Sequence, residues 1–182
     1  MSEEGRREAF RDLYERSFDE VLSYARRRAV SAGDADDAVA ETFLVAWRRF
    51  EELPAGERRL PYLYGIARRV LANQHRGEAR RRRLTDRLEA EAADERGTHG
   101  YSARSEVEDA LDSLPADQRE ILGLAYWEDL DAGEIAVALG CSRNAARIRL
   151  HRARRALRGA LEARSAGRRL NSLTTPIERR GQ

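Results

Sequence analysis

Residues 131–159 read DAGEIAVALGCSRNAARIRLHRARRALRG, and this stretch decides the fold of the second half of the chain. Asp131 stands three residues before Glu134, a spacing in which each side chain can accept a hydrogen bond from an unpaired backbone N–H at a helix start. Gly140 follows the short apolar run where a left-handed residue would end that helix. Ser142 can then cap a second, longer helix. Two helices joined by a tight turn predict a helix-turn-helix.

The second of these helices, predicted over residues 143–159, is strongly basic. It carries seven arginines and no acidic residue. Ile148, Leu150, Ala153 and Leu157 form an apolar stripe for packing, so the arginines fall on the outward arc. A basic helix face alone is usually a solvated surface, but this one adjoins a turn that presents the N-terminal end of the helix. We therefore predict that the helix binds DNA, with its first turns in the major groove.

The composition agrees with this prediction. The 182 residues include 34 basic residues, all of them arginine, and 32 acidic residues, which gives a net charge of +2. Residues 60–83 hold seven arginines and one glutamate, whereas residues 84–110 hold eight acidic residues and three arginines. Arginine suits phosphate binding, although a GC-rich genome also produces arginine-only sequences, and both causes stay open.

Cysteine usage and hydropathy predict the compartment. Cys141 is the only cysteine, which excludes an internal disulfide and favours a reducing compartment. No apolar run approaches the length of a membrane span, and the charged N-terminus lacks the apolar core of a signal peptide. We expect a cytoplasmic protein.

Hydrophobic residues recur with helical period in the first half as well, and no window alternates with the period of a strand. Asp34 and Asp37 place carboxylates at the start of a second helix, after a break over residues 31–33. Three apolar faces are expected to close around one core. They comprise Phe10, Leu13, Tyr14, Phe18, Val21, Leu22 and Ala25; Val39, Phe43, Ala46, Trp47 and Phe50; and Tyr62, Leu63, Ile66, Ala67, Val70 and Leu71.

These patterns predict an all-α fold of two small helical domains joined by a flexible linker. The first domain covers residues 8–84, and an acidic, alanine-rich linker covers residues 85–104. The helix-turn-helix domain covers residues 105–163, and residues 164–182 form a disordered basic tail. The core of the second domain is expected from Val107, Ala110, Leu111, Leu114, Ile121, Leu122, Leu124, Ala125 and Trp127.

Stretches from both halves, taken in order, match a known pattern. They are DADDAVAETFLVAWRRF at 34–50, YLYGIARR at 62–69, Leu114-Pro115 through Arg119-Glu120, YWE at 126–128, and the motif residues from 134 to 154. Together they resemble the extracytoplasmic-function group of bacterial RNA polymerase sigma factors, over about residues 8–161. The stretch at 34–50 resembles the polymerase-binding helix of that family, and the stretch at 62–69 resembles its helix facing the downstream promoter element.

The resemblance implies a protein that binds core RNA polymerase and promoter DNA, with no cofactor. The second domain would read the −35 element, and the first would open the −10 element, because aromatic and cationic side chains hold unstacked bases. An anti-sigma protein becomes a candidate partner. The implied contacts are Ser142, Arg143, Asn144, Arg147, Ile148, Arg149 and Arg152 for −35 DNA; Tyr62, Tyr64, Arg68, Arg69, Asn73 and Arg76 for −10 DNA; and Asp37, Glu41, Leu44 and Arg48 for polymerase.

Two alternative interpretations of the residues stay open at this point. Tyr62 and Tyr64 fit a core position as well as a DNA contact when the resemblance is set aside. A helix-turn-helix regulator that never enters polymerase is the main alternative function, although it would normally need a sensing domain or a dimer interface.

Catalysis is not expected. The carboxylates at 34–41 fit a helix cap and a partner-binding face better than a metal site, and the three histidines are scattered. No cysteine or histidine pair has zinc spacing, and no nucleophile has a base nearby in the pattern, which argues against a nucleic-acid enzyme with a fused binding domain.

Overall fold

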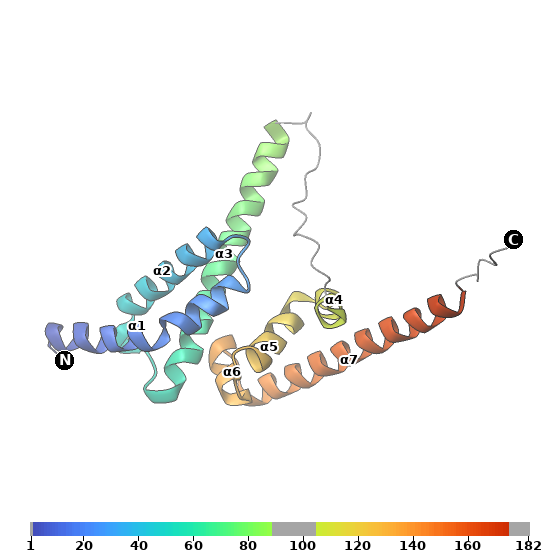
Figure 1. Cartoon of the computed structure of the whole chain (residues 1–182). Helices are drawn as coiled ribbons and strands as arrows, with labels where there is room; N and C mark the ends of the chain where they lie inside the picture. The colour runs from blue at the N-terminus through green and yellow to red at the C-terminus, as the bar shows by residue number, and fades with distance from the viewer. Residues whose placement is uncertain (1, 89–104, 175–182) are drawn as a thin grey trace, which may run out of the picture.

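The computed structural model describes residues 2–88 and 105–174, and every regular element in these ranges is a helix (Figure 1). The all-α prediction is therefore confirmed, and none of the described helices is long and apolar enough to cross a membrane. The helices are α1 (Glu3–Arg26), α2 (Ala32–Arg48), α3 (Arg59–Leu88), α4 (Glu106–Asp112), α5 (Ala116–Tyr126), α6 (Ala132–Leu139) and α7 (Arg143–Thr174), with short 3-10 turns at Phe50–Glu52 and Gly56–Arg58.

The first domain consists of α1, α2 and α3, which pack against one another around one core. Val21, Phe43 and Leu63 come from the three predicted apolar faces and are all buried. The predicted start of the second helix is two residues late, because Ser31 acts as its cap. The Ser31 Oγ accepts a hydrogen bond from the backbone N–H of Asp34 at 3.1 Å, which places Asp34 in the first turn.

Aromatic rings join α1 to α2 and to the 3-10 turn that follows α2. Phe10 packs edge-on against Trp47 and Phe50, with ring centroids 5.1 and 5.9 Å apart. Trp47 is only half-buried, whereas Phe43 is fully buried, and the guanidinium of Arg6 covers the Trp47 ring at 4.6 Å. Trp47 therefore lies at the edge of the core, and Phe43 lies inside it.

The second domain consists of α4 to α7 and contains the predicted helix-turn-helix. The Asp131 and Glu134 side chains form the expected capping box at the start of α6. Gly140 ends α6 with φ +65°, in the left-handed region that glycine adopts without strain. Ser142 caps α7 by accepting the backbone N–H of Ala145 at 3.1 Å. The predicted turn chemistry is confirmed.

Three apolar residues of the second domain lie outside the core in which the pattern predicts them. Ile148 is 44% exposed, because it lies about 200° around the helix from the buried Leu150. Ala146 takes its place in the packing stripe. Trp127 is 53% exposed and Val107 is 49% exposed, so neither belongs to the core.

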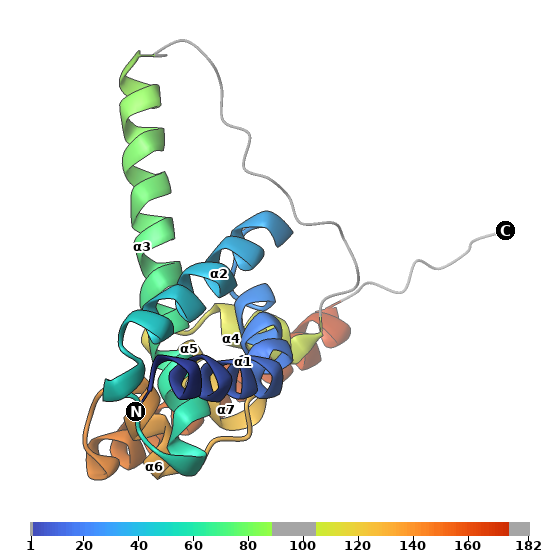
Figure 2. The ribbon, with the colours of Figure 1, turned by 90° about the vertical axis from the view of Figure 1, so that its left-hand side faces the viewer.

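Two predicted boundaries fall inside helices. Helix α3 continues to Leu88, so residues 85–88 are helical, while residues 89–104 of the predicted linker lie outside the described residues. The C-terminal half of α3 extends away from the other helices (Figure 2). Helix α7 continues to Thr174, which corrects the prediction of disorder for residues 164–174. An ion pair between Arg164 and Asp109 of α4 helps to hold this extension, and residues 175–182 lie outside the described residues.

The two domains contact each other directly. Helix α3 packs on α6, and the C-terminal end of α1 lies against α5. Gly65 of α3 comes so close to α6 that an added Cβ would lie 2.7 Å from the carbonyl oxygen of Ala138. The arrangement leaves the N-terminal end of α7 facing solvent.

Candidate nucleic-acid interface

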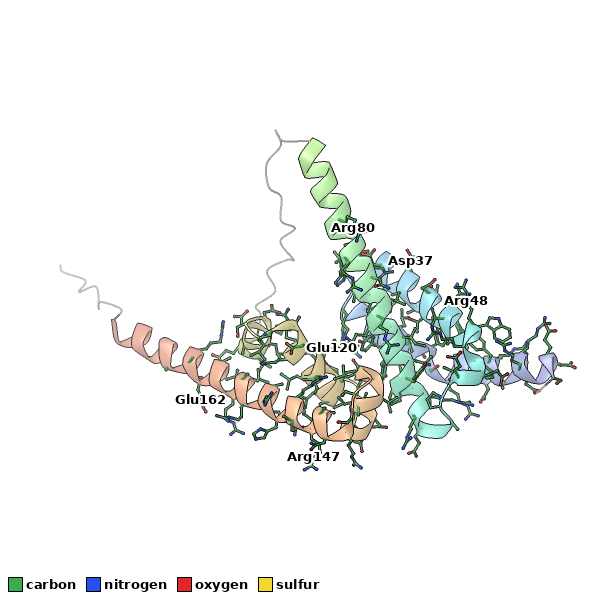
Figure 3. All side chains as sticks on the ribbon, turned by 180° about the vertical axis from the view of Figure 1, so that it is seen from behind. Asp37, Arg48, Arg80, Glu120, Arg147 and Glu162 are labelled. Atoms are coloured by element: carbon green, nitrogen blue, oxygen red, sulfur yellow. The ribbon has the colours of Figure 1, made fainter. Side chains whose placement is uncertain are left out.

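The start of α7 presents the predicted base-reading residues to solvent. Arg143, Asn144 and Arg147 are all exposed, and so are Arg149 and Arg152 in the next turn. Figure 3 shows Arg147 pointing away from the body of the molecule. Nothing among the described residues blocks the approach of a DNA groove to this end of the helix.

A hollow lies between this face of α7 and the N-terminal end of α6. Its lining includes Asn144, Arg147, His151, Arg154 and Arg155. Arg154 and Arg155 lie in later turns of α7, so they are expected to contact phosphates and not base edges. They line the same hollow because residues three, four and seven positions apart lie on one face of a helix. His151 is not among the predicted contacts, although its position four residues after Arg147 is the signal that could have found it.

Asp131 sets the electrostatics of the hollow's rim. Its Oδ1 accepts the backbone N–H of Glu134 at 2.8 Å and that of Gly133 at 2.6 Å. The pKa of Asp131 is lowered by these two backbone hydrogen bonds, Glu134 first, and by the nearby charge of Arg143. The Arg143 guanidinium lies 3.8 Å from Asp131 Oδ2, with both side chains more than half exposed. Such an exposed pair is weak, so Arg143 stays available for another anion.

The predicted −10 residues are divided between two environments. Arg69, Asn73 and Arg76 are exposed along α3, and Arg76 donates to Asn73 Oδ1 at 2.5 Å. Tyr62 and Arg68 are half-buried, and Tyr64 is buried.

The surroundings of Tyr64 belong to both domains. Its ring stacks on that of Tyr24, with centroids 5.0 Å apart. Burial raises the pKa of Tyr64 well above its ordinary value, with a further contribution from the charge of Glu128 in the second domain.

The predicted polymerase contacts form one exposed stripe along α2. Asp37, Glu41, Leu44 and Arg48 are spaced by four, three and four residues and are all exposed. Leu44 is 41% exposed, which is unusual for a leucine on a helix whose opposite face supplies the core. Figure 3 shows Asp37 and Arg48 along this helix, away from the junction with the second domain.

Sequence reasoning missed two features. One is an apolar groove lined by Val107, Leu111, Leu122, Tyr126, Trp127 and Leu157. The position of Tyr126 and Trp127 was a signal, because Tyr126 is the last residue of α5 and Trp127 follows it at the helix end. The other is a polar network at the domain junction, whose members are too far apart in the sequence to give a local signal.

Comparisons with known proteins cover both domains. The family model for sigma-70 region 2 matches residues 13–81, and the model for sigma-70, region 4 matches residues 104–157. The ECF RNA polymerase sigma factor SigD of Mycobacterium tuberculosis is 32% identical over 171 residues, covering 87% of this chain and 80% of the relative. The sigma factor CarQ of Myxococcus xanthus is 32% identical over 162 residues, covering 87% and 92%.

Two solved structures share the fold. One is the sigma factor RpoE of Bartonella quintana in complex with the anti-sigma factor NepR, with a TM-score of 0.62 at 24% identity, covering 85% of this chain and 97% of that one. The other is CnrH in complex with the cytosolic domain of CnrY, with a TM-score of 0.58 at 25% identity, covering 86% and 90%.

Proposed function

The chain belongs to the extracytoplasmic-function RNA polymerase sigma factors, and from this membership we propose which of its surfaces meet polymerase and which meet promoter DNA. As a sigma factor it acts in promoter-specific transcription initiation by RNA polymerase. No observation favours a regulator that stays outside polymerase.

The polymerase contact is the α2 stripe of Asp37, Glu41, Leu44 and Arg48. The observation that supports this assignment is their shared exposure along one helix face, opposite the buried Val39 and Phe43. Charged residues around a single exposed leucine give a surface with an apolar centre and a polar rim, which is typical of a protein interface.

The −35 contact is the first part of α7. Arg143, Asn144 and Arg147 are exposed in the turns that a helix-turn-helix places in the major groove, where arginine and asparagine pair with purine edges. Ser142, Ile148, Arg149 and Arg152 complete the set, with the exposed Ile148 suited to a thymine methyl group.

The −10 contact is the exposed side of α3 around Arg69, Asn73 and Arg76. The half-buried Tyr62 and Arg68 adjoin it, and Tyr64, the remaining predicted contact, is buried in this structure. Cationic and aromatic groups on one helix suit a single strand whose bases have left the duplex. The described residues contribute binding surfaces to this reaction, and we propose that the chain is not an enzyme.

We also propose that the chain works in the cytoplasm and has an anti-sigma protein as regulatory partner. The complex of RpoE with the anti-sigma factor NepR, which shares the fold of this chain, supports a protein partner of this kind.

Run-off transcription with purified core polymerase tests the proposal on promoter fragments from the source genome. The wild type should give discrete transcripts. Asp37→Lys with Glu41→Lys should lose both transcription and co-elution with polymerase. The matched control is Glu15→Lys with Asp19→Lys, which makes the same charge change on the exposed side of α1. A chain that binds promoter fragments but never co-elutes with polymerase would instead be a regulator.

A further inference from the structure

The hollow between α6 and α7 contains one negative side chain among several positive ones. Its charged and titratable lining consists of the Asp131 carboxylate, one histidine and four arginines, which are His151, Arg147, Arg152, Arg154 and Arg155. No other carboxylate of the described ranges lines this hollow. A surface that only holds the negative backbone of DNA is weakened by a carboxylate at this place, so the charge of Asp131 requires another explanation.

Helix α6 is the first helix of the helix-turn-helix, and its N-terminal end lies at the hollow. The first helix of such a motif crosses the DNA backbone. Free backbone N–H groups at a helix N-terminus bind phosphate, because the helix dipole adds to their hydrogen bonds. With free N–H groups, α6 would therefore make a phosphate contact that is the same for every DNA sequence.

Asp131 prevents this contact by using the N–H groups itself. Its Oδ1 accepts the N–H of Gly133 at 2.6 Å and that of Glu134 at 2.8 Å. The Glu134 side chain accepts the N–H of Asp131 at 2.8 Å. The side chain of Asp131 is 62% exposed, so its charge acts on any group that enters the hollow. A carboxylate thus occupies the place at the start of α6 where a phosphate would bind.

Arg143 lies next to the same carboxylate. Its guanidinium is 3.8 Å from Asp131 Oδ2, and its side chain is 71% exposed. Asp131 repels a phosphate that approaches Arg143, whereas the edge of a guanine carries no net charge and is not repelled in this way. The carboxylate therefore weakens contacts of Arg143 with the DNA backbone more than its contacts with bases.

We propose that Asp131 is a specificity-determining residue of the −35 surface, which acts by repelling phosphates from Arg143 and from the hollow. Its carboxylate lowers the affinity of the chain for DNA of any sequence. It has less effect in the complex with the correct element, where Arg143 contacts a base. This role rests on the proposed function, because it requires that the start of α7 reads the −35 element.

The main test removes the charge of Asp131 and keeps its cap. Asparagine and serine both cap helices well, so Asp131→Asn and Asp131→Ser should leave α6 folded. Asp129→Asn is the matched control, because it removes the same charge from an exposed side chain that does not line the hollow. Asparagine also suits the left-handed backbone of Asp129, with φ +51°. Circular dichroism should show the same helicity in all four proteins.

The measurement is binding of the full chain to two duplexes. One is the −35 duplex of a promoter that the wild type transcribes, and the other is a scrambled duplex of the same length and composition. Both Asp131 variants should bind the scrambled duplex about threefold more tightly than the wild type, which is the scale of one exposed charge interaction. Affinity for the −35 duplex should change less, so the ratio of the two affinities should fall. Asp129→Asn should match the wild type.

A double-mutant cycle tests the part played by Arg143. In an Arg143→Ala background, the gain of Asp131→Asn on the scrambled duplex should be smaller, because the cation for which phosphate and carboxylate compete is gone. An undiminished gain in this background would overturn the competition for Arg143.

The remaining outcomes separate repulsion from other effects. Unchanged affinity of both Asp131 variants for the scrambled duplex, or an equal gain on both duplexes, would overturn the role in specificity. Tightening by Asp131→Asn alone would show a new contact of the asparagine amide, and an equal gain by Asp129→Asn would show an effect of net charge, and either result would overturn the proposal. Failure of the proposed function is recognised separately, because the wild type itself would then give no transcripts with core polymerase.

Discussion

Arg147 and Arg155 lie two turns apart on α7 and line the same hollow, yet we expect different roles for them. Arg147→Ala should weaken binding to the preferred −35 sequence by about 1–3 kcal/mol and relax specificity, because a lost bidentate contact penalises only the correct base. Arg155→Ala is the matched control. It should weaken binding to all sequences alike and reduce by about one unit the slope of the logarithm of affinity against the logarithm of salt concentration. Titrations on matched and scrambled duplexes at several salt concentrations separate the two, and uniform weakening by Arg147→Ala would contradict base reading.

Two glycines of the second domain should respond in opposite directions to the same substitution. Gly140→Ala should destabilise the domain by about 1–2 kcal/mol, because an L residue is strained at φ +65°. Gly159→Ala should stabilise it by about 0.5–1 kcal/mol, since Gly159 is inside a helix with open space around it. Urea denaturation of both variants measures the difference. Stabilisation by both would show that the turn does not require glycine.

At the scale of the element, the start of α6 should give the helix-turn-helix a dependence on pH. The pKa of Asp131 is lowered in the folded chain, chiefly by the backbone N–H of Glu134, so its ionised form stabilises the fold. This stability is present above the ordinary pKa of aspartate and is lost as pH falls through the lowered value. Asp131→Asn keeps a capping oxygen but does not titrate.

Thermal melts of wild type and Asp131→Asn measure this effect. The wild type should be the more stable of the two at about pH 7, and the difference should shrink as the pH falls below the ordinary pKa of aspartate. A difference that stays constant over this range would show that the charge of Asp131 does not stabilise the helix start.

At the scale of the whole molecule, the buried junction should couple the two domains during unfolding. We expect one calorimetric transition for the wild type, because domains that share a buried charged network lose stability together. Gly65→Ala should give two transitions, and its control Gly77→Ala, in the same helix with no atom within 4 Å of the new Cβ, should give one. Two transitions in the wild type would show that the junction contributes little to stability.

The features that could be predicted from the sequence are those that depend on residues close together in the chain. The caps at Asp131 and Ser142 and the left-handed Gly140 depend on neighbouring residues, so their chemistry is readable from the chain itself, whereas Ser31 falls in a predicted break and its cap is not predicted. The core prediction for Trp127 is wrong because hydrophobicity alone does not say which side of a helix end faces inward. The predicted length of α7 is too short, since the helix continues to Thr174, and the pairing of Arg164 with Asp109 on another helix gives no local signal.

Which residues belong to the candidate site was easier to predict than which of them are exposed and which are buried. The exposed stripe at Asp37, Glu41 and Arg48 follows from helical periodicity, because its opposite face is apolar. Tyr64 is buried with its ring stacked on Tyr24 of α1, beside the approach of α6 at Gly65, and no local pattern in α3 reveals these contacts. Residues joined across the junction, such as Arg28 and Glu120, are separated by 92 positions and carry no shared periodicity.

Helix α7 is continuous, so the recognition residues at its start and the residues at its C-terminal end move together as one rigid element. Its 32 residues, at about 1.5 Å of rise each, form a rod about 48 Å long. A tilt of about 10° around the far end would carry Arg143 sideways by about 8 Å, more than two base-pair steps of about 3.4 Å. Because α7 also packs on α4, α5 and α6, such a tilt would carry the whole second domain with it, so the bases that lie under the recognition residues depend on how this domain is oriented.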